Sequence, residues 1–241
     1  MFDAYEPYVD RLINIKDYED RVARGEFGSP TLPDPARCPL CKEGLQCRAG
    51  HTKDDRHFAH PINPANKCRL KPEHGLPYVH LPPRVPDPVA EQQNIQFMKA
   101  HFDAIFARMS ESADMIPFFD LGEFVELLRE ARRLRAYAYQ GVEGWMLPYV
   151  LCTLRTFLPK DSKKDRDKKP MRKMTFRFYY DAGVPDLQEL WINKGNGAQL
   201  FRATYSGKTL RNVVHVAQRQ DYLTLKASLS DKQRDWILRE I

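Results

Sequence analysis

A dense group of cysteines and histidines between residues 38 and 68 constrains this chain more than any other feature of its sequence. Four of the five cysteines and three of the seven histidines fall in this stretch. It opens with Cys38-Pro39-Leu40-Cys41, and a Cys-x2-Cys hook is typical of the first half of a tetrahedral zinc site. Because few aliphatic residues are available there to form a core, the pattern predicts that a metal ion holds the segment in shape.

Two sets of four ligands fit this segment. The compact set would form a knuckle-like loop and consists of Cys38, Cys41, Cys47 and His51. The open set joins two ligand pairs through a longer loop and consists of Cys38, Cys41, one of His57 or His60, and Cys68. Two pairs separated by such a loop are the commoner design of zinc ribbons and fingers. Either set fills all four positions around the metal, which predicts a structural zinc ion (Zn2+) rather than a catalytic one.

The remaining composition predicts a folded protein that stays in the cytoplasm. Hydrophobic residues make up 42% of the 241 residues and charged residues 29%, a balance that can bury a core. No run approaches the length of apolar sequence that a membrane span needs, so no membrane association is expected. The first residues, Met1 to Tyr8, lack the basic and apolar regions of a secretory signal, so the cysteines are expected to stay reduced.

The distribution of prolines divides the chain into two expected domains. Residues 1–25 carry apolar side chains at a spacing compatible with an amphipathic helix, which precedes the cysteine segment. Residues 72–88 contain six prolines and are expected to form an extended connector. The predicted domains are residues 1–80, with the N-terminal helix and the zinc-binding module, and residues 90–241, with a helical bundle and a small antiparallel sheet.

Helical patterns dominate the first half of the second domain. A stripe at a 3-4-3-4 spacing predicts a helix from about residue 90, and it consists of Ile95, Met98, Phe102, Ile105 and Met109. Asp120 is the predicted N-cap of a second helix, and Trp145 to Leu158 forms a third apolar segment. These three segments are expected to pack as a small helical bundle.

The last third of the chain has the composition of an antiparallel sheet closed by a helix. The expected strands are residues 175–180, 189–194, 199–205 and 211–217. Gly195-Asn196-Gly197 predicts a hairpin turn between the second and the third of them. Ser230 and Gln233 have the spacing of a capping box that opens a final helix. The predicted fold class is therefore α+β.

Positive charge is concentrated in one segment. The formal net charge of the chain is +6, and residues 160–173 alone account for +5. The basic residues of this segment are Lys160, Lys163, Lys164, Arg166, Lys168, Lys169, Arg172 and Lys173. Lysines and arginines on a loop neutralise phosphates and release counterions, which predicts salt-dependent binding of nucleic acid, whereas the alternative is a solvated linker. A second basic group on the helix after Asp120 can follow a phosphate backbone, and it consists of Arg129, Arg132 and Arg133.

An ordered set of short motifs runs through the cysteine segment. It consists of Cys38-Pro39-Leu40-Cys41, Arg48-Ala49-Gly50, His57-Phe58-Ala59-His60, Cys68 and Glu73-His74. These motifs resemble the N-terminal zinc-binding module of the CoiA-like competence proteins, and the resemblance is confined to residues 38–74. It implies a bacterial or mobile-element protein that handles DNA. It also favours the open ligand set in the form Cys38, Cys41, His60 and Cys68, with His57 as the substitute.

The same family has a restriction-endonuclease-like nuclease domain after this module. Such a domain needs an acidic residue on one strand and Glu-x-Lys on the next to hold a magnesium ion. Three acidic residues, Asp181, Asp186 and Glu189, lie near expected strands, but the stretch from Leu190 to Lys194 contains no Glu-x-Lys. The sequence therefore predicts a protein without catalytic residues, and a nuclease is the alternative.

The function expected from these features is binding of nucleic acid, specifically DNA, by a zinc-containing and non-catalytic protein. Other protein subunits are expected as partners in a larger nucleoprotein complex. A CRISPR-type RNA-guided effector is one assembly in which a small zinc-bearing subunit meets target DNA. The alternatives are a metal-dependent nuclease of the CoiA-like class and a protein-only adaptor.

Overall fold

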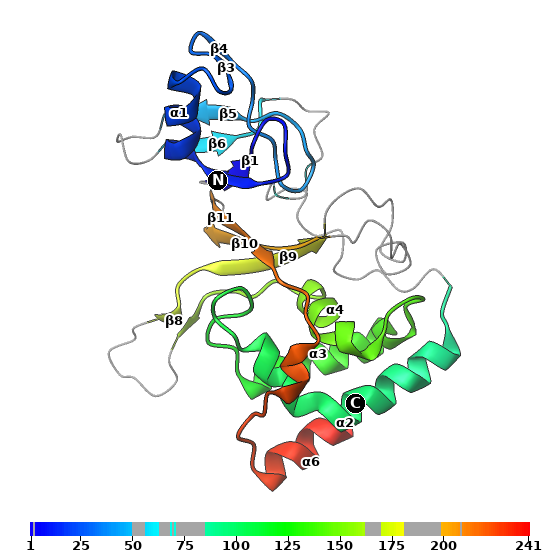
Figure 1. The fold of residues 1–241 in the computed structure, drawn as a ribbon. Coiled ribbons are helices and arrows are strands. Elements are labelled where there is room, and N and C mark those ends of the chain that lie inside the picture. The colour runs from blue at the N-terminus through cyan, green and yellow to red at the C-terminus, as the bar shows by residue number, and fades with distance from the viewer. Residues whose placement is uncertain are drawn as a thin grey trace.

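The computed structural model describes residues 1, 3–49, 56–62, 68, 70, 85–161, 170–180, 199–207 and 209–241, and it confirms the α+β fold class. Figure 1 shows three layers: an N-terminal part at the top, a three-stranded sheet in the middle and a group of helices below it. Buried side chains of all three layers belong to one hydrophobic cluster. None of the described helices is long and apolar enough to cross a membrane.

The N-terminal part consists of short antiparallel strand pairs and one helix: β1 (Asp3–Tyr5), β2 (Leu12–Asn14), α1 (Ile15–Ala23), β3 (Gly28–Ser29), β4 (Leu32–Pro33), β5 (Gln46–Arg48) and β6 (His57–Ala59). The helix expected over residues 1–25 begins only at Ile15, because the preceding residues form the β1–β2 hairpin. Tyr5 exchanges two backbone hydrogen bonds of 2.8 Å with Arg37. Tertiary pairing with a distant residue thus overrides the helical periodicity of this stretch.

The β3–β4 hairpin depends on Gly28. Its φ angle is +77°, and a Cβ atom at this position would lie 2.8 Å from the carbonyl oxygen of Leu32. We expect Gly28→Ala to lower the free energy of unfolding by more than the roughly 1–2 kcal/mol that a left-handed conformation alone costs. Gly25→Ala is the matched control, because Gly25 has a φ angle of +76° but open space around its Cβ position. Urea denaturation measures both losses, and equal values would contradict the steric role of Leu32.

The first two helices predicted for residues 90–241 are confirmed. α2 (Pro88–Met109) buries four of the five residues of the predicted stripe and partly buries the fifth, Ile95. Asp120 caps α3 (Leu121–Arg133) as predicted, since its carboxylate accepts a hydrogen bond of 2.9 Å from the backbone N–H of Glu123. The Glu123 side chain reaches back to the backbone of Asp120 and completes a capping box. Local sequence signals therefore locate both helices and mark the start of α3.

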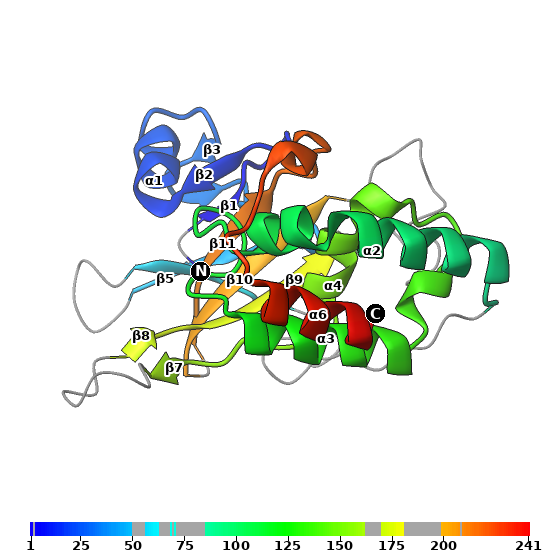
Figure 2. The same ribbon diagram turned by 90° about the horizontal axis from the view of Figure 1, so that it is seen from below.

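The third helix is shorter than the expected residues 145–158. A 3-10 turn leads into α4 (Leu147–Thr153), which ends early because Phe157 already pairs with Phe176 of the sheet through two backbone hydrogen bonds of 2.9 Å. The final helix, α6 (Asp231–Glu240), opens with the predicted capping box. It lies beside α3 at the outer surface of the helical layer (Figure 2).

The central sheet has the antiparallel strand order β11–β10–β9. Its strands are β9 (Thr175–Tyr180), β10 (Leu200–Ser206) and β11 (Thr209–Val216), which confirm three predicted strands. The expected strand at 189–194 and its turn at 195–197 lie outside the described residues. Both faces of β9 are covered, because Phe178 packs on Phe157 of the helical layer while Tyr179 is buried on the opposite face. The sheet is therefore an inner layer.

Hydrogen bonds also join the N-terminal part to the sheet. Tyr205 Oη of β10 donates to the backbone carbonyl of Leu70 at 3.1 Å, close to the last cysteine of the cluster. Tyr5 Oη of β1 donates to Gln199 Oε1, just before β10, at 2.8 Å. The cysteine segment is thus held directly against the sheet.

A short strand pair extends from one end of the helical layer (Figure 2). It consists of β7 (Lys160–Asp161) and β8 (Pro170–Arg172), in which Lys160 is paired with Arg172. Residues 162–169, which connect the two strands, lie outside the described residues. The pair brings the two ends of the basic segment to one place on the molecule.

Candidate metal centre and nucleic-acid interface

The structure brings Cys38, Cys41, His60 and Cys68 together. Their ligand atoms all lie within 4.8 Å of one another. The Sγ atoms of Cys38 and Cys68 are 3.7 Å apart, and Cys41 Sγ is 3.3 Å from His60 Nε2. Donor atoms of a tetrahedral zinc ion are about 3.3–3.8 Å apart, given metal–ligand distances of about 2.0–2.3 Å. The group could therefore hold a metal ion, and it is the open ligand set in its His60 form.

Two local structures position these ligands. The Cys38–Cys41 hook closes through a hydrogen bond of 2.9 Å from the backbone N–H of Lys42 to the carbonyl of Cys38, and Lys42 has a φ angle of 61°. The β5–β6 ladder then sets the register that places His60, directly after β6, beside this hook. Phe58 of β6 is fully buried against Tyr18 of α1 and anchors the ladder.

Three sulfur atoms at this spacing cannot all be negatively charged without a cation. Burial, reinforced by the neighbouring thiols of Cys41 and Cys68, raises the pKa of Cys38 well above its ordinary value. Hydrogen bonds from Cys38 and Cys68 lower the pKa of Cys41. A divalent cation at the centre of the group would stabilise all three thiolates. The donor set of three sulfurs and one imidazole nitrogen suits a borderline-soft metal such as zinc.

The other proposed ligands do not join the group. Cys47 is an exposed residue of β5, and His57 lies at the start of β6, opposite Arg48. His51 lies outside the described residues. The compact set is therefore not the one that the described residues assemble.

The basic segment is divided by the structure into residues with different roles. Arg172 is buried, and its guanidinium donates to Glu123, to the carbonyl of Leu158 at 2.8 Å and to that of Pro117 at 3.2 Å. The expectation that Arg172 contacts phosphate is therefore revised, because its charge and its hydrogen bonds are used inside the protein. Lys160 is also engaged, since its ammonium group forms ion pairs with Asp120 and with Glu123.

The other basic residues of the segment are Lys173 and five residues between β7 and β8. Lys173 is exposed. The remaining predicted phosphate contacts lie outside the described residues, and they are Lys163, Lys164, Arg166, Lys168 and Lys169. If the segment binds phosphate, these residues must carry most of the affinity.

The arginines of α3 are matched by carboxylates. Arg129 donates two hydrogen bonds, of 2.9 and 2.6 Å, to Glu240 of α6. Arg133 forms an equivalent pair with Glu130, one turn earlier on the same helix. Arg132 is exposed. Because an ion-paired guanidinium offers less charge to a phosphate, this helix is a weaker nucleic-acid candidate than its sequence indicates.

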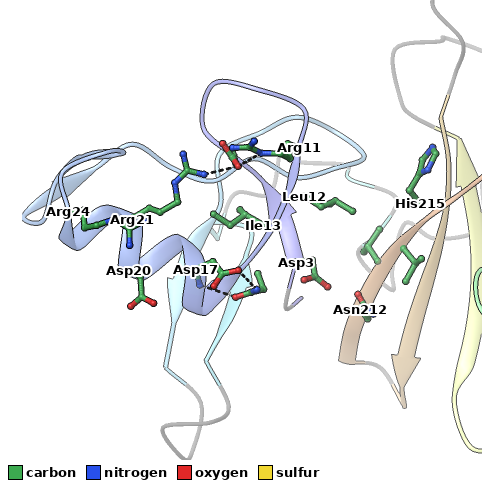
Figure 3. Close-up of a pocket in the computed structure, with 14 residues that line it drawn as sticks. Asp3, Arg11, Leu12, Ile13, Asp17, Asp20, Arg21, Arg24, Asn212 and His215 are labelled. Atoms are coloured by element: carbon green, nitrogen blue, oxygen red, sulfur yellow. Dashed lines mark hydrogen bonds and ion pairs between the residues drawn. The ribbon is translucent and has the colours of Figure 1, made fainter.

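A cleft of about 740 Å³ lies between the N-terminal part and β11 (Figure 3). Asp3 and Asn212 line it from its two sides, and His215 lies near its rim. On the far wall, Arg11 and Arg21 both bind the buried Glu6 at 2.5 and 2.8 Å, and these contacts hold the pKa of Glu6 below its ordinary value. The sequence contains no motif that predicts this cleft, since it forms between segments far apart along the chain. Its charges are mixed, so they indicate no ligand class.

None of the protein-family models, curated proteins or solved structures compared with the chain matches it. The resemblance to the CoiA-like module therefore stays a prediction. So does the nuclease alternative, whose acidic residues Asp181, Asp186 and Glu189 lie outside the described residues. Function has to be inferred from the chain's own residues.

Proposed function

We propose that this protein is a zinc-containing, non-catalytic nucleic-acid-binding protein. It would bind DNA as a subunit of a larger nucleoprotein complex. The observation that carries the proposal is the closed group of Cys38, Cys41, His60 and Cys68. Four protein ligands leave no coordination position for a substrate or a reactive water, so the metal would be structural. The zinc ion would hold the hook and the β5–β6 ladder against the sheet.

The basic segment supports the nucleic-acid part of the proposal. Between the ends that β7 and β8 hold, residues 162–169 contain five basic and two acidic residues. The carboxylates of Glu123 and Asp120 bind Lys160 and Arg172, the basic residues at the base of this strand pair. A local excess of positive charge favours phosphate as its partner.

A quadruple substitution tests this role. We expect Lys163→Gln, Lys164→Gln, Lys168→Gln and Lys169→Gln together to weaken binding of duplex DNA about 100-fold at low salt. The slope of log Kd against log salt should fall by about 3–4, because each lost phosphate contact removes about 0.9 from it. Fluorescence anisotropy with a labelled oligonucleotide across a salt series measures both quantities.

The control changes the same net charge elsewhere. It replaces four exposed lysines by glutamine, namely Lys16, Lys99, Lys226 and Lys232. Its affinity should fall only slightly. Equal losses in both variants would assign binding to net charge rather than to the segment, and no binding by the unmodified protein at low salt would favour the adaptor. Cleavage of the oligonucleotide with magnesium would overturn the non-catalytic assignment.

A further inference from the structure

Phe118 is an aromatic residue that the fold holds out in solvent. Its side chain is 55% exposed, whereas the next residue, Phe119, is only 7% exposed. The φ angle of Phe118 is 53°, in the left-handed region that bulky residues rarely adopt. Residues in such conformations persist only where their surroundings impose them, and they are concentrated at binding and catalytic sites.

The surroundings of Phe118 fix its backbone on both sides. Phe119 packs on three aromatic rings of the helical core, those of Phe106, Phe124 and Phe157. On the other side, the carbonyl of Pro117 accepts the hydrogen bond from the buried Arg172. The Phe118 ring is therefore presented by a rigid segment, which reduces the conformational entropy that a ligand would have to remove on binding.

A second exposed apolar residue lies in the same region. Leu158 is 61% exposed, and its carbonyl binds the same guanidinium of Arg172 that binds Pro117. The backbones next to Phe118 and at Leu158 thus lie within reach of one side chain. The exposed Lys173 directly follows Arg172. We call Phe118, Leu158 and Lys173 the Phe118 surface.

We propose that the Phe118 surface binds single-stranded nucleic acid, with an unpaired base stacked on the Phe118 ring and the adjoining phosphate beside Lys173. This inference rests on the proposed function and specifies the form of its ligand. Proteins that bind single strands combine a positively charged path for the backbone with aromatic rings on which bases stack. The surface lies at the root of the most basic segment of the chain, which favours a polyanion over an apolar protein partner.

The substitution Phe118→Asn tests the inference without disturbing the fold. Asparagine tolerates the left-handed region, so the melting temperature should stay unchanged or rise. Loss of one stacked base should weaken binding of a single-stranded oligonucleotide about 5- to 100-fold, since stacking contributes about 1–3 kcal/mol per base. Binding of duplex DNA should stay the same, because its bases are already stacked. Phe118→Trp should keep the single-strand affinity, because tryptophan also offers an aromatic ring on which a base can stack.

Leu32→Asn is the matched control, because Leu32 is 80% exposed on the β3–β4 hairpin and should not affect either ligand. An unchanged single-strand affinity in Phe118→Asn would overturn the inference, and the proposed function would stand if the lysine variant still lost affinity. Parallel losses for single and double strands would also overturn base stacking. Loss of a co-purifying protein subunit, with nucleic-acid binding intact, would instead assign the surface to a protein contact. Absence of any nucleic-acid binding by the unmodified protein would refute both proposals.

Discussion

Cys38→Ser should abolish the binding of one zinc ion per chain and unfold the region around β5 and β6. Cys38 is fully buried at the centre of the ligand group, 3.7 Å from the sulfur of Cys68. A serine hydroxyl is a poor zinc ligand. The apparent binding free energy of structural zinc is about 10–16 kcal/mol in small domains, and it is folding free energy where the site does not form in the unfolded chain. We therefore expect a loss larger than that of any single substitution outside the ligand group.

Elemental analysis of the purified protein and thermal denaturation followed by circular dichroism measure this effect. A strong chelator should lower the melting temperature of the unmodified protein in the same way. Cys47→Ser is the matched control, because Cys47 lies on β5 but outside the ligand group, so the variant should keep its zinc and its stability. A metal-free protein with an unchanged melting temperature would contradict the structural role of the metal.

Arg108→Met should be the most damaging substitution outside the ligand group. The side chain of Arg108 is 1% exposed, donates two hydrogen bonds of 2.8 Å to Asp114, and donates another of 2.9 Å to the carbonyl of Ala217, just after β11. It thereby joins α2 to the end of the sheet. Removing one partner of a buried ion pair leaves the other without compensation and costs about 3–5 kcal/mol. The melting temperature should fall by roughly 10 °C, given about 2–4 °C per kcal/mol for a chain of this size.

The same ion pair predicts how stability depends on pH. Burial raises the pKa of Asp114, but its hydrogen bonds and charge interaction with Arg108 outweigh burial and hold the pKa below the ordinary value of 3.8. The ion pair therefore contributes full stability above about pH 4, and this contribution is lost as the pH falls through the lowered pKa. In Arg108→Met, only the backbone hydrogen bond from Ala217 and the charge of Arg219 still oppose the effect of burial on the pKa of Asp114, so this acid-dependent loss of stability should become smaller.

Arg219→Met is the control for Arg108→Met. Arg219 binds Glu111, as Arg108 does, but its side chain is 43% exposed. An exposed ion pair contributes about 0–1 kcal/mol, so the melting temperature should change little. If the two substitutions had equal effects, the buried network around Arg108 would not be the stabilising element.

Elements that depend on neighbouring residues could be predicted from the sequence. The carboxylate of Asp120 and the hydroxyl of Ser230 cap helices that begin at the next residue, because an N-cap bonds backbone groups only two or three positions away. The α2 stripe was predictable for the same reason, since residues three and four apart share one helix face. The β1–β2 hairpin was not, because its pairing with Arg37 depends on a contact that no local pattern contains.

The partners of charged side chains were harder to predict from the sequence than the positions of helices and strands. Arg172 belongs to the basic segment in sequence, yet it is buried against Glu123, a residue of the α3 capping box. Neighbours in the sequence do not reveal such a partner, because the ion pair forms only when β8 is packed beside α3. The same reasoning applies to Arg129 and its partner Glu240.

The sequence by itself determined which residues can serve as metal ligands and where the main helices and three of the strands lie. It did so because ligand chemistry, helix capping and side-chain periodicity are properties of short stretches. Only the tertiary structure decided that His60 rather than His57 joins the three cysteines, since the β5–β6 register sets that choice. It also decided that Arg172 turns inward while Phe118 stays in solvent, because packing between distant segments determines which side chains remain available to a ligand.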